Sequence, residues 1–314
     1  MNARVKKTDD SVLFQPNDYL HPKYWFTWIT FGLLWLTTLF PYAFQVKLGR
    51  FLGRLILKVA GQKEKTIDTN LRLCFPQKSI EERNHIKNKT YESYGISLLE
   101  LAMCWWWKAE RLKPLVEVRG LEHVEKCLEN KQAVILLSGH FTSLEIGGRL
   151  LALSLPFQAM YRTQKNQLFD SYLFTRRQSY LVDVISRKKT RSVIKGIRSL
   201  VPTWYAPDQN FARERNVFAP FFGIPTATIT ASTRLAASAN AAMLPFYPER
   251  KSDGSGYILW IEPPLKNFPS GDEIVDATSI NTTIEQFVIK NPDQYMWMHP
   301  RFKTRPDGEA KIYQ

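Results

Sequence analysis

From residue 115 onward, short runs rich in β-branched and aromatic residues alternate with longer segments of helical periodicity. The extended runs cover residues 115–118, 133–137, 157–161, 181–185, 203–206, 243–247 and 257–261. Helical patterns lie between most of them, near 121–129, 143–153, 167–179, 190–200, 228–239 and 272–290. This alternation is typical of an α/β fold, in which helices cover the faces of a central sheet. No linker rich in Pro and Gly divides the region.

The segment before this pattern, residues 64–107, is predicted to be helical. Ser79 and Glu82 have the spacing of a capping box, which marks a helix start. With this helical segment included, we predict one large domain over residues 63–314.

A long uncharged segment precedes that domain. Residues 24–46 contain no Asp, Glu, Lys or Arg, and as a helix they would extend roughly 34 Å, enough to cross a bilayer core. We therefore predict a membrane-spanning or deeply inserted helix there, after an N-terminal segment of residues 1–23. Pro41 would kink this helix or mark its exit. A buried core helix, or a helix lying in the membrane interface, is the alternative.

Residues 47–62 have the pattern of a basic amphipathic helix. Spacings of 3, 4 and 4 align four cations on one stripe, opposite an apolar side: Lys47, Arg50, Arg54 and Lys58. Such a helix lies on an anionic leaflet, although a helix packed on the protein with a solvated charged face is the alternative. Residues 1–23 hold four Lys or Arg and residues 47–65 hold six. This bias predicts a single pass with the large C-terminal part in the cytoplasm.

Composition narrows the possible partners. The chain has 314 residues, a net charge of +14 and 13% aromatic residues, which indicates a surface that meets something anionic and amphipathic. A nucleic-acid binder fits the charge but not the uncharged segment, and no nucleic-acid motif is present. The three cysteines lack CxxC spacing, and neither GxGxxG nor Walker sequences occur. We therefore expect no disulfide, no metal and no nucleotide cofactor.

The first candidate for chemistry follows the apolar run 133–137. Gly139 permits a tight turn that brings His140 to the edge of the sheet where ligands bind. Glu145 lies five residues later, and a carboxylate bonded to one imidazole nitrogen would make His140 a general base. Thr142 and Glu145 also have capping-box spacing, so Glu145 can equally be a helix cap.

Cations cluster around two further strand ends. Arg162 follows the run 157–161, and Arg177 lies in the next helical segment. Beside His140 they could hold phosphates or stabilise an oxyanion, although any single Arg is more simply a solvated surface charge. A second group, Arg187, Lys188, Lys189, Arg191, Lys195 and Arg198, indicates a surface patch for an acidic partner or lipid headgroups.

Taken in order, several blocks resemble one family. They are the HxxxxE motif of His140 and Glu145, Tyr161-Arg162, Trp204-Tyr205-Ala206-Pro207-Asp208, Phe221-Phe222-Gly223, Leu244-Pro245-Phe246, and the tail 292–299 leading into 301–306. Together they resemble the late (secondary) acyltransferases of lipid A biosynthesis, the lauroyl/myristoyl transferase family of Gram-negative bacteria. The chain departs from the expected pattern at Pro300, where a basic residue is expected.

The resemblance implies a mixed central sheet with helices on both faces, as in glycerolipid acyltransferases, and a catalytic dyad of His140 and Glu145. It also puts Arg177 and Asp208 in the site, without defining their roles. The donor would be a fatty acyl thioester on acyl carrier protein, and the acceptor a phosphorylated, acylated lipid A precursor in the inner membrane. His140 would deprotonate a hydroxyl on an acceptor acyl chain, and no covalent acyl-enzyme would form.

Two other functions stay open at this point. A glycerophospholipid or other glycolipid O-acyltransferase has a related motif, which usually carries Asp where Glu145 stands. A membrane-bound binding protein without catalysis would use Glu145 only as a helix cap.

Overall fold

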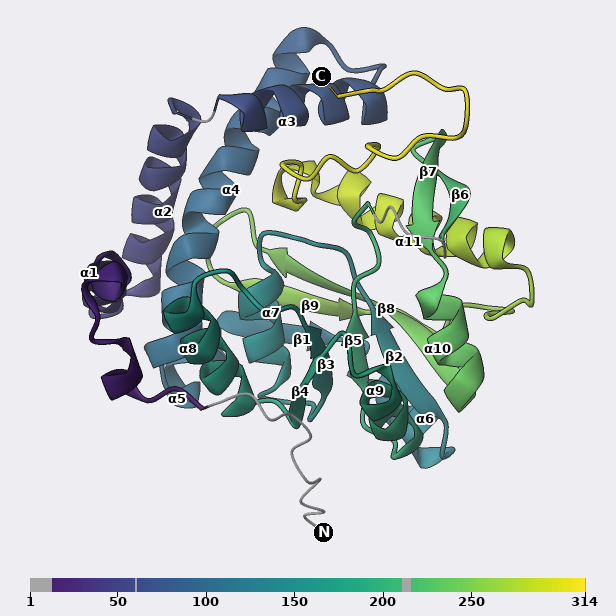
Figure 1. Cartoon of the computed structure of the whole chain (residues 1–314), viewed down its shortest axis with the longest axis horizontal. Coiled ribbons are helices and arrows are strands. Elements are labelled where there is room, and N and C mark those ends of the chain that lie inside the picture. Colours follow the sequence, from purple (N-terminus) through teal and green to yellow (C-terminus); the bar gives the residue numbers. More distant parts are fainter. Residues whose placement is uncertain (1–12, 60, 211–215, 314) are drawn as a thin grey trace.

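A computed structural model describes residues 13–59, 61–210 and 216–313, so the first twelve residues of the N-terminal segment lie outside it. The centre is a seven-stranded sheet with the order β1-β9-β8-β2-β5-β3-β4 (Figure 1). Its strands are β1 (Val116–Arg119), β2 (Ala133–Leu137), β3 (Gln158–Tyr161), β4 (Asp183–Ser186), β5 (Thr203–Tyr205), β8 (Ala241–Arg250) and β9 (Tyr257–Ile261). Each of the seven predicted extended runs overlaps one of these strands.

Strand directions divide the sheet into two parts. β8, β2, β5, β3 and β4 are mutually parallel, whereas β9 pairs with β8 in the antiparallel sense and β1 pairs with β9 in the parallel sense. The predicted mixed sheet is therefore confirmed. Because the five parallel strands, from β8 to β4, share one direction, their carboxyl ends meet at a single edge of the sheet. Polar side chains from several loops come together there.

Helices cover both faces of the sheet, as predicted. They are α1 (Trp25–Thr37), α2 (Tyr42–Leu57), α3 (Gln62–Cys74), α4 (Ile80–Trp106), α5 (Ala109–Leu112), α6 (Leu121–Glu129), α7 (Leu144–Leu151), α8 (Gln167–Gln178), α9 (Thr190–Arg198), α10 (Ala231–Ala239) and α11 (Glu273–Lys290). The predicted helical segment 64–107 is two helices, α3 and α4, and the predicted capping box of Ser79 and Glu82 is present at the start of α4.

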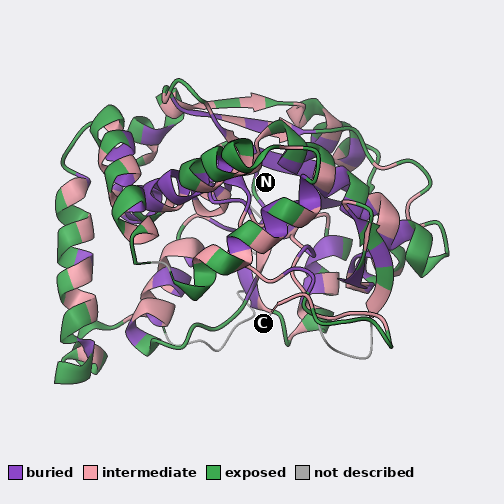
Figure 2. Ribbon diagram, turned by 90° about the horizontal axis from the view of Figure 1, so that it is seen from above, coloured by how far each residue is buried: buried purple, intermediate pink, exposed green. Residues whose placement is uncertain are grey.

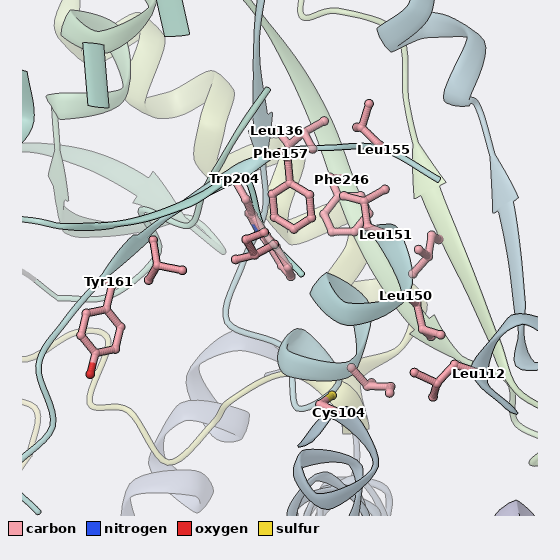
Figure 3. Close-up of a cluster of buried hydrophobic side chains, with 14 of the residues drawn as sticks. Cys104, Leu112, Leu136, Leu150, Leu151, Leu155, Phe157, Tyr161, Trp204 and Phe246 are labelled. Atoms are coloured by element: carbon pink, nitrogen blue, oxygen red, sulfur yellow. The ribbon is translucent and has the colours of Figure 1, made fainter. Parts of the chain in front are cut away.

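The alternation of side chains along β2 builds a separate core on each face. Val134 and Leu136 join one buried cluster with residues of α6, α7 and α8, part of which is drawn in Figure 3. Ala133, Ile135 and Leu137 point the other way, into a cluster with residues of α9, α10 and α11. All five residues of β2 are buried, as expected for a central strand that is covered on both faces.

A two-stranded hairpin, β6 (Asn216–Phe221) and β7 (Ile224–Ile229), was not predicted from the sequence. Its two-residue turn is Phe222-Gly223, and both residues have positive φ angles of 51° and 74°. Turns of this kind match the twist of paired strands, and the second position favours glycine. The predicted helix near 228–239 starts later as a result, at Ala231 in α10.

The predicted membrane-spanning helix over residues 24–46 is wrong, because the chain turns between α1 and α2. Pro41 lacks the amide hydrogen that a continuous helix would need. The turn is held on the protein, since the carbonyl oxygen of Thr38 accepts hydrogen bonds from Trp107 Nε1 at 2.8 Å and Arg111 Nη1 at 2.6 Å. Among residues 13–59, 61–210 and 216–313, no helix combines the length and apolar character needed to cross a bilayer.

The helix predicted over residues 47–62 corresponds to the later part of α2, which begins earlier, at Tyr42, ends earlier, at Leu57, and packs against α4. The closest approach of the two helices is at glycines, although Arg54 of the cationic stripe also pairs with Glu92 of α4 at 2.8 Å and Ile56 of the apolar side packs against the core. Gly49 and Gly53 of α2 face Gly95 of α4, where an added Cβ would lie 2.0 Å from the Gly49 carbonyl oxygen. The side of α2 that meets α4 most closely therefore carries glycines, whereas large apolar side chains on other sides of α2, such as Phe51, remain exposed.

Candidate active site

His140 is held in the turn that follows β2. The ladder between β2 and β5 continues through a hydrogen bond from the Ser138 amide to the Tyr205 carbonyl, and then the chain bends. The amide of His140 donates to Asp208 Oδ2 at 2.8 Å, and its ring Nδ1 shares a 2.5 Å hydrogen bond with Asp208 Oδ1. Asp208 follows β5, the neighbour of β2, so the two residues meet at the carboxyl edge of adjacent parallel strands.

The tail of the chain supports this pair from a third direction. Tyr295 donates its hydroxyl to Asp208 Oδ2 at 2.9 Å. The amide of Met296 bonds to the carbonyl of His140, and the amide of Thr142 bonds to the carbonyl of Gln294. Asp208 is 2% exposed, whereas 26% of the His140 side chain is exposed. The carboxylate is therefore enclosed, and the imidazole remains accessible.

Electrostatics define which nitrogen of His140 can act as a base. Burial disfavours the ionised carboxyl of Asp208, but attraction to His140 and the hydrogen bonds it accepts outweigh burial and lower its pKa to about 2. Burial likewise opposes the charged form of His140, yet the charge of Asp208 and the shared hydrogen bond raise its pKa. An ionised carboxylate can only accept, so the proton between them belongs to Nδ1. In the neutral ring, the lone pair is then on Nε2.

The predicted hydrogen bond between Glu145 and His140 is not present, although the structure describes both residues. Glu145 instead accepts a hydrogen bond from Arg177 Nε of α8 at 3.0 Å, a second one from Arg177 Nη2, and one from the Tyr180 hydroxyl at 3.2 Å. The carboxylate on the imidazole is Asp208, which local sequence spacing could not reveal because it lies 68 residues away.

The predicted capping box of Thr142 and Glu145 is also absent. α7 begins at Leu144 with Ser143 at its N-cap, so Glu145 is the second helical residue instead of the third. Thr142 is hydrogen-bonded to Ser93 of α4 at 2.7 Å. Glu145 is thus free to pair with Arg177, and the two side chains are 16% and 21% exposed.

The two predicted arginines differ in their surroundings. The pKa of Arg177 is raised because attraction to Glu145 outweighs the effect of burial, so its guanidinium stays charged, and it lies over the Tyr161 ring at 5.8 Å. Arg162 follows β3 at the same edge of the sheet and is exposed. Its side chain has no hydrogen bond or ion pair with any described residue.

Tyr295 and His299 had no predicted role, although both belong to the tail block, residues 292–299. His299 Nε2 accepts a hydrogen bond from the amide of Asn210, two residues after Asp208, at 2.7 Å. Burial lowers the pKa of His299 to about 4, with further lowering from Arg301, so this ring is neutral at physiological pH. The block of polar and aromatic residues in the tail was the only signal for this contact.

Two other kinds of catalytic group, metal ligands and reactive thiols, can be compared with the pair of His140 and Asp208. Across residues 13–59, 61–210 and 216–313, no group of three or more His, Cys, Asp or Glu side chains is arranged to hold a metal ion. All three cysteines are buried, and burial raises the pKa of each thiol. The arrangement that can move a proton is a partly exposed imidazole hydrogen-bonded to a buried carboxylate.

The sequence profile of bacterial lipid A biosynthesis acyltransferases matches residues 14–304 of this chain. The chain belongs to this family. It is 37% identical over 295 residues to the lipid A biosynthesis lauroyltransferase of Escherichia coli K12, covering 94% of this chain and 96% of that protein. The E. coli palmitoleoyltransferase is 36% identical over 297 residues, covering 94% and 97%. The E. coli myristoyltransferase is 28% identical over 302 residues, covering 94% and 92%.

Membership in this family makes the chain a late acyltransferase of lipid A biosynthesis, as the ordered blocks of the sequence predicted. Two pairs of ionisable side chains extend from loops and helices that follow the parallel strands: His140 with Asp208, and Glu145 with Arg177. Because ligands in such folds bind at the carboxyl edge of the sheet, these pairs are the natural candidate for the site of acyl transfer in this acyltransferase.

Proposed function

We propose that this acyltransferase moves a fatty acyl chain from acyl carrier protein to a hydroxyl group on an acyl chain of a phosphorylated lipid A precursor. The observation that carries the proposal is the 2.5 Å contact of His140 Nδ1 with the buried carboxylate of Asp208. It leaves Nε2 as the base on a side chain that solvent and substrate can reach.

In the proposed reaction, Nε2 of His140 accepts the proton of the acceptor hydroxyl while that oxygen attacks the thioester carbonyl. Asp208 stabilises the imidazolium that forms, and the C–S bond then breaks. The proton returns from Nε2 to the departing sulfur, so the products are an ester and a free thiol. Asp208 therefore has the function that sequence spacing suggested for Glu145.

Glu145 belongs to the proposed site as the partner of Arg177. The doubly hydrogen-bonded carboxylate holds the guanidinium of Arg177 in one orientation, 32 residues away along the chain. A fixed cation can bind a phosphate or stabilise the oxyanion of the tetrahedral intermediate. Arg162, exposed after β3, is suited to contact the phosphorylated headgroup of the acceptor.

Direct transfer without an acyl-enzyme is the simplest chemistry for these residues. A covalent intermediate on sulfur requires a thiolate, and burial raises the pKa of all three thiols. The two hydroxyls nearest to His140 in sequence, those of Ser138 and Thr142, are both buried. The first donates to the Gly139 carbonyl and the second is hydrogen-bonded to Ser93.

The proposed location is the cytoplasmic surface of the inner membrane, with α1 and α2 as an interfacial anchor. Only Phe31 of α1 is buried, and Figure 2 shows this helix at the left edge of the molecule, coloured mainly as exposed or intermediate. Exposed large apolar side chains gather on α1, α2 and the turns that follow them: Trp25, Phe26, Ile29, Leu33, Trp35, Leu36, Leu39, Phe40, Phe44, Phe51, Leu55 and Val59. Exposed Lys47 and Lys58 suit anionic headgroups.

The test is transfer of a labelled acyl chain from acyl carrier protein, with lauroyl, myristoyl and palmitoleoyl donors. The acceptors are a phosphorylated lipid A precursor and, in parallel, a lysophospholipid. We expect the wild type to acylate the lipid A precursor, and the His140→Ala enzyme to lose turnover while its circular dichroism is unchanged. Full activity of His140→Ala would overturn the base assignment, and preference for the lysophospholipid would favour a glycerolipid acyltransferase.

A further inference from the structure

The segment around α9 is the most one-sidedly charged part of the described chain. The 24 residues from 184 to 207 contain six Lys or Arg and no Asp or Glu. α9 is anchored by Val193 and Ile197, which are buried against the sheet. The cations are on the other side of the helix and in the turn before it. We refer to Arg187, Lys188, Arg191 and Lys195 as the α9 basic face.

The α9 basic face is exposed, and no carboxylate of the described residues neutralises its charges. All four side chains are exposed. None of them forms an ion pair with a carboxylate of the residues that the structure describes. Elsewhere in the fold, cations are commonly paired, as Lys87 is with Glu64 at 2.9 Å and Lys290 is with Glu249 at 3.1 Å. An unpaired group of four cations is a surface suited to an acidic ligand.

A hollow of about 400 Å³ lies on the same helix, lined by Arg191, Ile194, Lys195, Arg198 and Ser199. Ile194 is partly exposed among these polar residues. The surface therefore offers an apolar contact surrounded by positive charge, which is the usual arrangement of a protein interface, with a hydrophobic centre and a charged rim.

The α9 basic face begins at the same edge of the sheet as the candidate active site. Moving across the parallel strands, the carboxyl ends of β2, β5, β3 and β4 lead in turn to His140, Asp208, Arg162 and Arg187. Neighbouring strands are about 4.8 Å apart, so three steps place β4 about 15 Å from β2. A partner bound at α9 would thus be within reach of His140 for a flexible arm, but not for a rigid side chain.

A lipid surface suits this face poorly. None of the exposed large apolar side chains lies between residues 181 and 210, whereas α1 and α2 carry many of them. Figure 1 shows α1 and α2 at the left edge of the molecule and α9 to the right of centre, beyond β3 and β4. A helix that binds a membrane needs apolar anchors as well as cations, and the apolar residues Val193 and Ile197 of α9 are turned inward.

We propose that the α9 basic face is the docking surface for the acidic carrier protein that delivers the acyl thioester. The proposal rests on the proposed function, which supplies the donor, and adds where that donor binds. The carrier's acidic surface lies against Arg187, Lys188, Arg191 and Lys195, and its flexible acyl-bearing arm extends along the strand ends, past Arg162, to place the thioester beside His140.

The test is the double variant Arg191→Glu/Lys195→Glu, which changes the charge by −4 on exposed positions. Its matched control is Lys108→Glu/Lys126→Glu, with the same charge change at exposed positions next to α5 and in α6, on the opposite face of the sheet. We measure binding of fluorescent acyl carrier protein, the KM and kcat for the acyl-carrier donor, and binding to vesicles of phosphatidylglycerol and phosphatidylcholine.

We expect the α9 variant to weaken carrier binding and raise KM about tenfold or more, with kcat within twofold of wild type. The control should stay within twofold on every measure. Equal carrier binding by the α9 variant, the control and the wild type would overturn the proposal, and so would loss of vesicle binding with carrier binding intact.

Binding by the His140→Ala enzyme separates this proposal from the proposed function, because carrier binding needs no turnover. If wild type transfers no acyl chain but binds the carrier through the α9 basic face, the proposed reaction fails and the docking surface stands. If wild type transfers the chain and both charge variants do so equally well, the docking surface fails and the reaction stands.

Discussion

Replacing Gly95 in α4 by alanine should destabilise the protein, although alanine is the better helix former. The new Cβ would lie 2.0 Å from the Gly49 carbonyl oxygen and 2.4 Å from the Gly53 amide nitrogen, both backbone atoms of α2. Ordinary contacts are at 3.4–4 Å, so α2 must move away by 1.4 Å or more (3.4 minus 2.0). Overpacking of this kind costs about 1–3 kcal/mol, against a gain of about 1 kcal/mol from helix propensity.

We therefore expect Gly95→Ala to lower the free energy of unfolding by up to about 2 kcal/mol, the overpacking cost less the gain in helix propensity. Gly32→Ala is the matched control, because Gly32 lies inside α1 with nothing within 4 Å of the added Cβ. That substitution should stabilise α1 by about 1 kcal/mol. Denaturant unfolding in detergent gives the free energy of unfolding of each variant. Hydrogen exchange of the α2 and α1 amides shows which helix has changed in stability. A Gly95→Ala protein as stable as wild type, with unchanged exchange in α2, would refute the close packing.

Three further outcomes follow from the site and the anchor. His140 must be neutral to act as a base, and its pKa is raised above 6.5, so kcat/KM should rise with pH through a midpoint above 6.5. The Asp208→Asn variant removes the attracting negative charge, so the midpoint of its pH–rate profile should be lower than that of the wild type. Its plateau value of kcat/KM should also be lower. Tyr295→Phe should weaken the support of Asp208 and reduce kcat severalfold with little change in KM, which steady-state kinetics would measure; an unchanged kcat would contradict this role. Phe26→Asp, at a side chain that is 81% exposed, should weaken vesicle binding about tenfold or more in a sedimentation assay, whereas Ile289→Asp on α11 should not.

The α/β architecture could be predicted because its signals are local. The run 133–137 is apolar at every position, which identifies a strand covered on both faces, and all five residues are buried. The spacing of Ser79 and Glu82 likewise predicted a helix start that the structure contains. Strand pairing is not local, so the reversed direction of β1 and β9 required the three-dimensional structure.

The pairing of residues in the candidate site was hidden for the same reason, although the resemblance had already placed Arg177 and Asp208 there. His140 and Glu145 stand five residues apart, which made their pairing an obvious hypothesis, but α7 turns the Glu145 carboxylate toward Arg177. Asp208 reaches His140 only because β5 lies beside β2. At the N-terminus, the charged and apolar stripes of α2 were visible in the sequence. The sequence did not show how α2 meets α4, where the closest contact is between Gly49, Gly53 and Gly95.

The tail contacts of His140 also bear on when the enzyme becomes active during its synthesis. The backbone of Gln294 and Met296 closes the loop around His140, and Asn70 of α3 holds the carbonyls of Trp297 and His299 at 2.7 and 2.9 Å. Gln294 follows His140 by 154 residues in the chain, so these partners are synthesised well after the loop that they hold. A nascent chain that has not yet reached residues 294–299 therefore lacks these contacts, so the loop around His140 can be completed only after this segment has been synthesised.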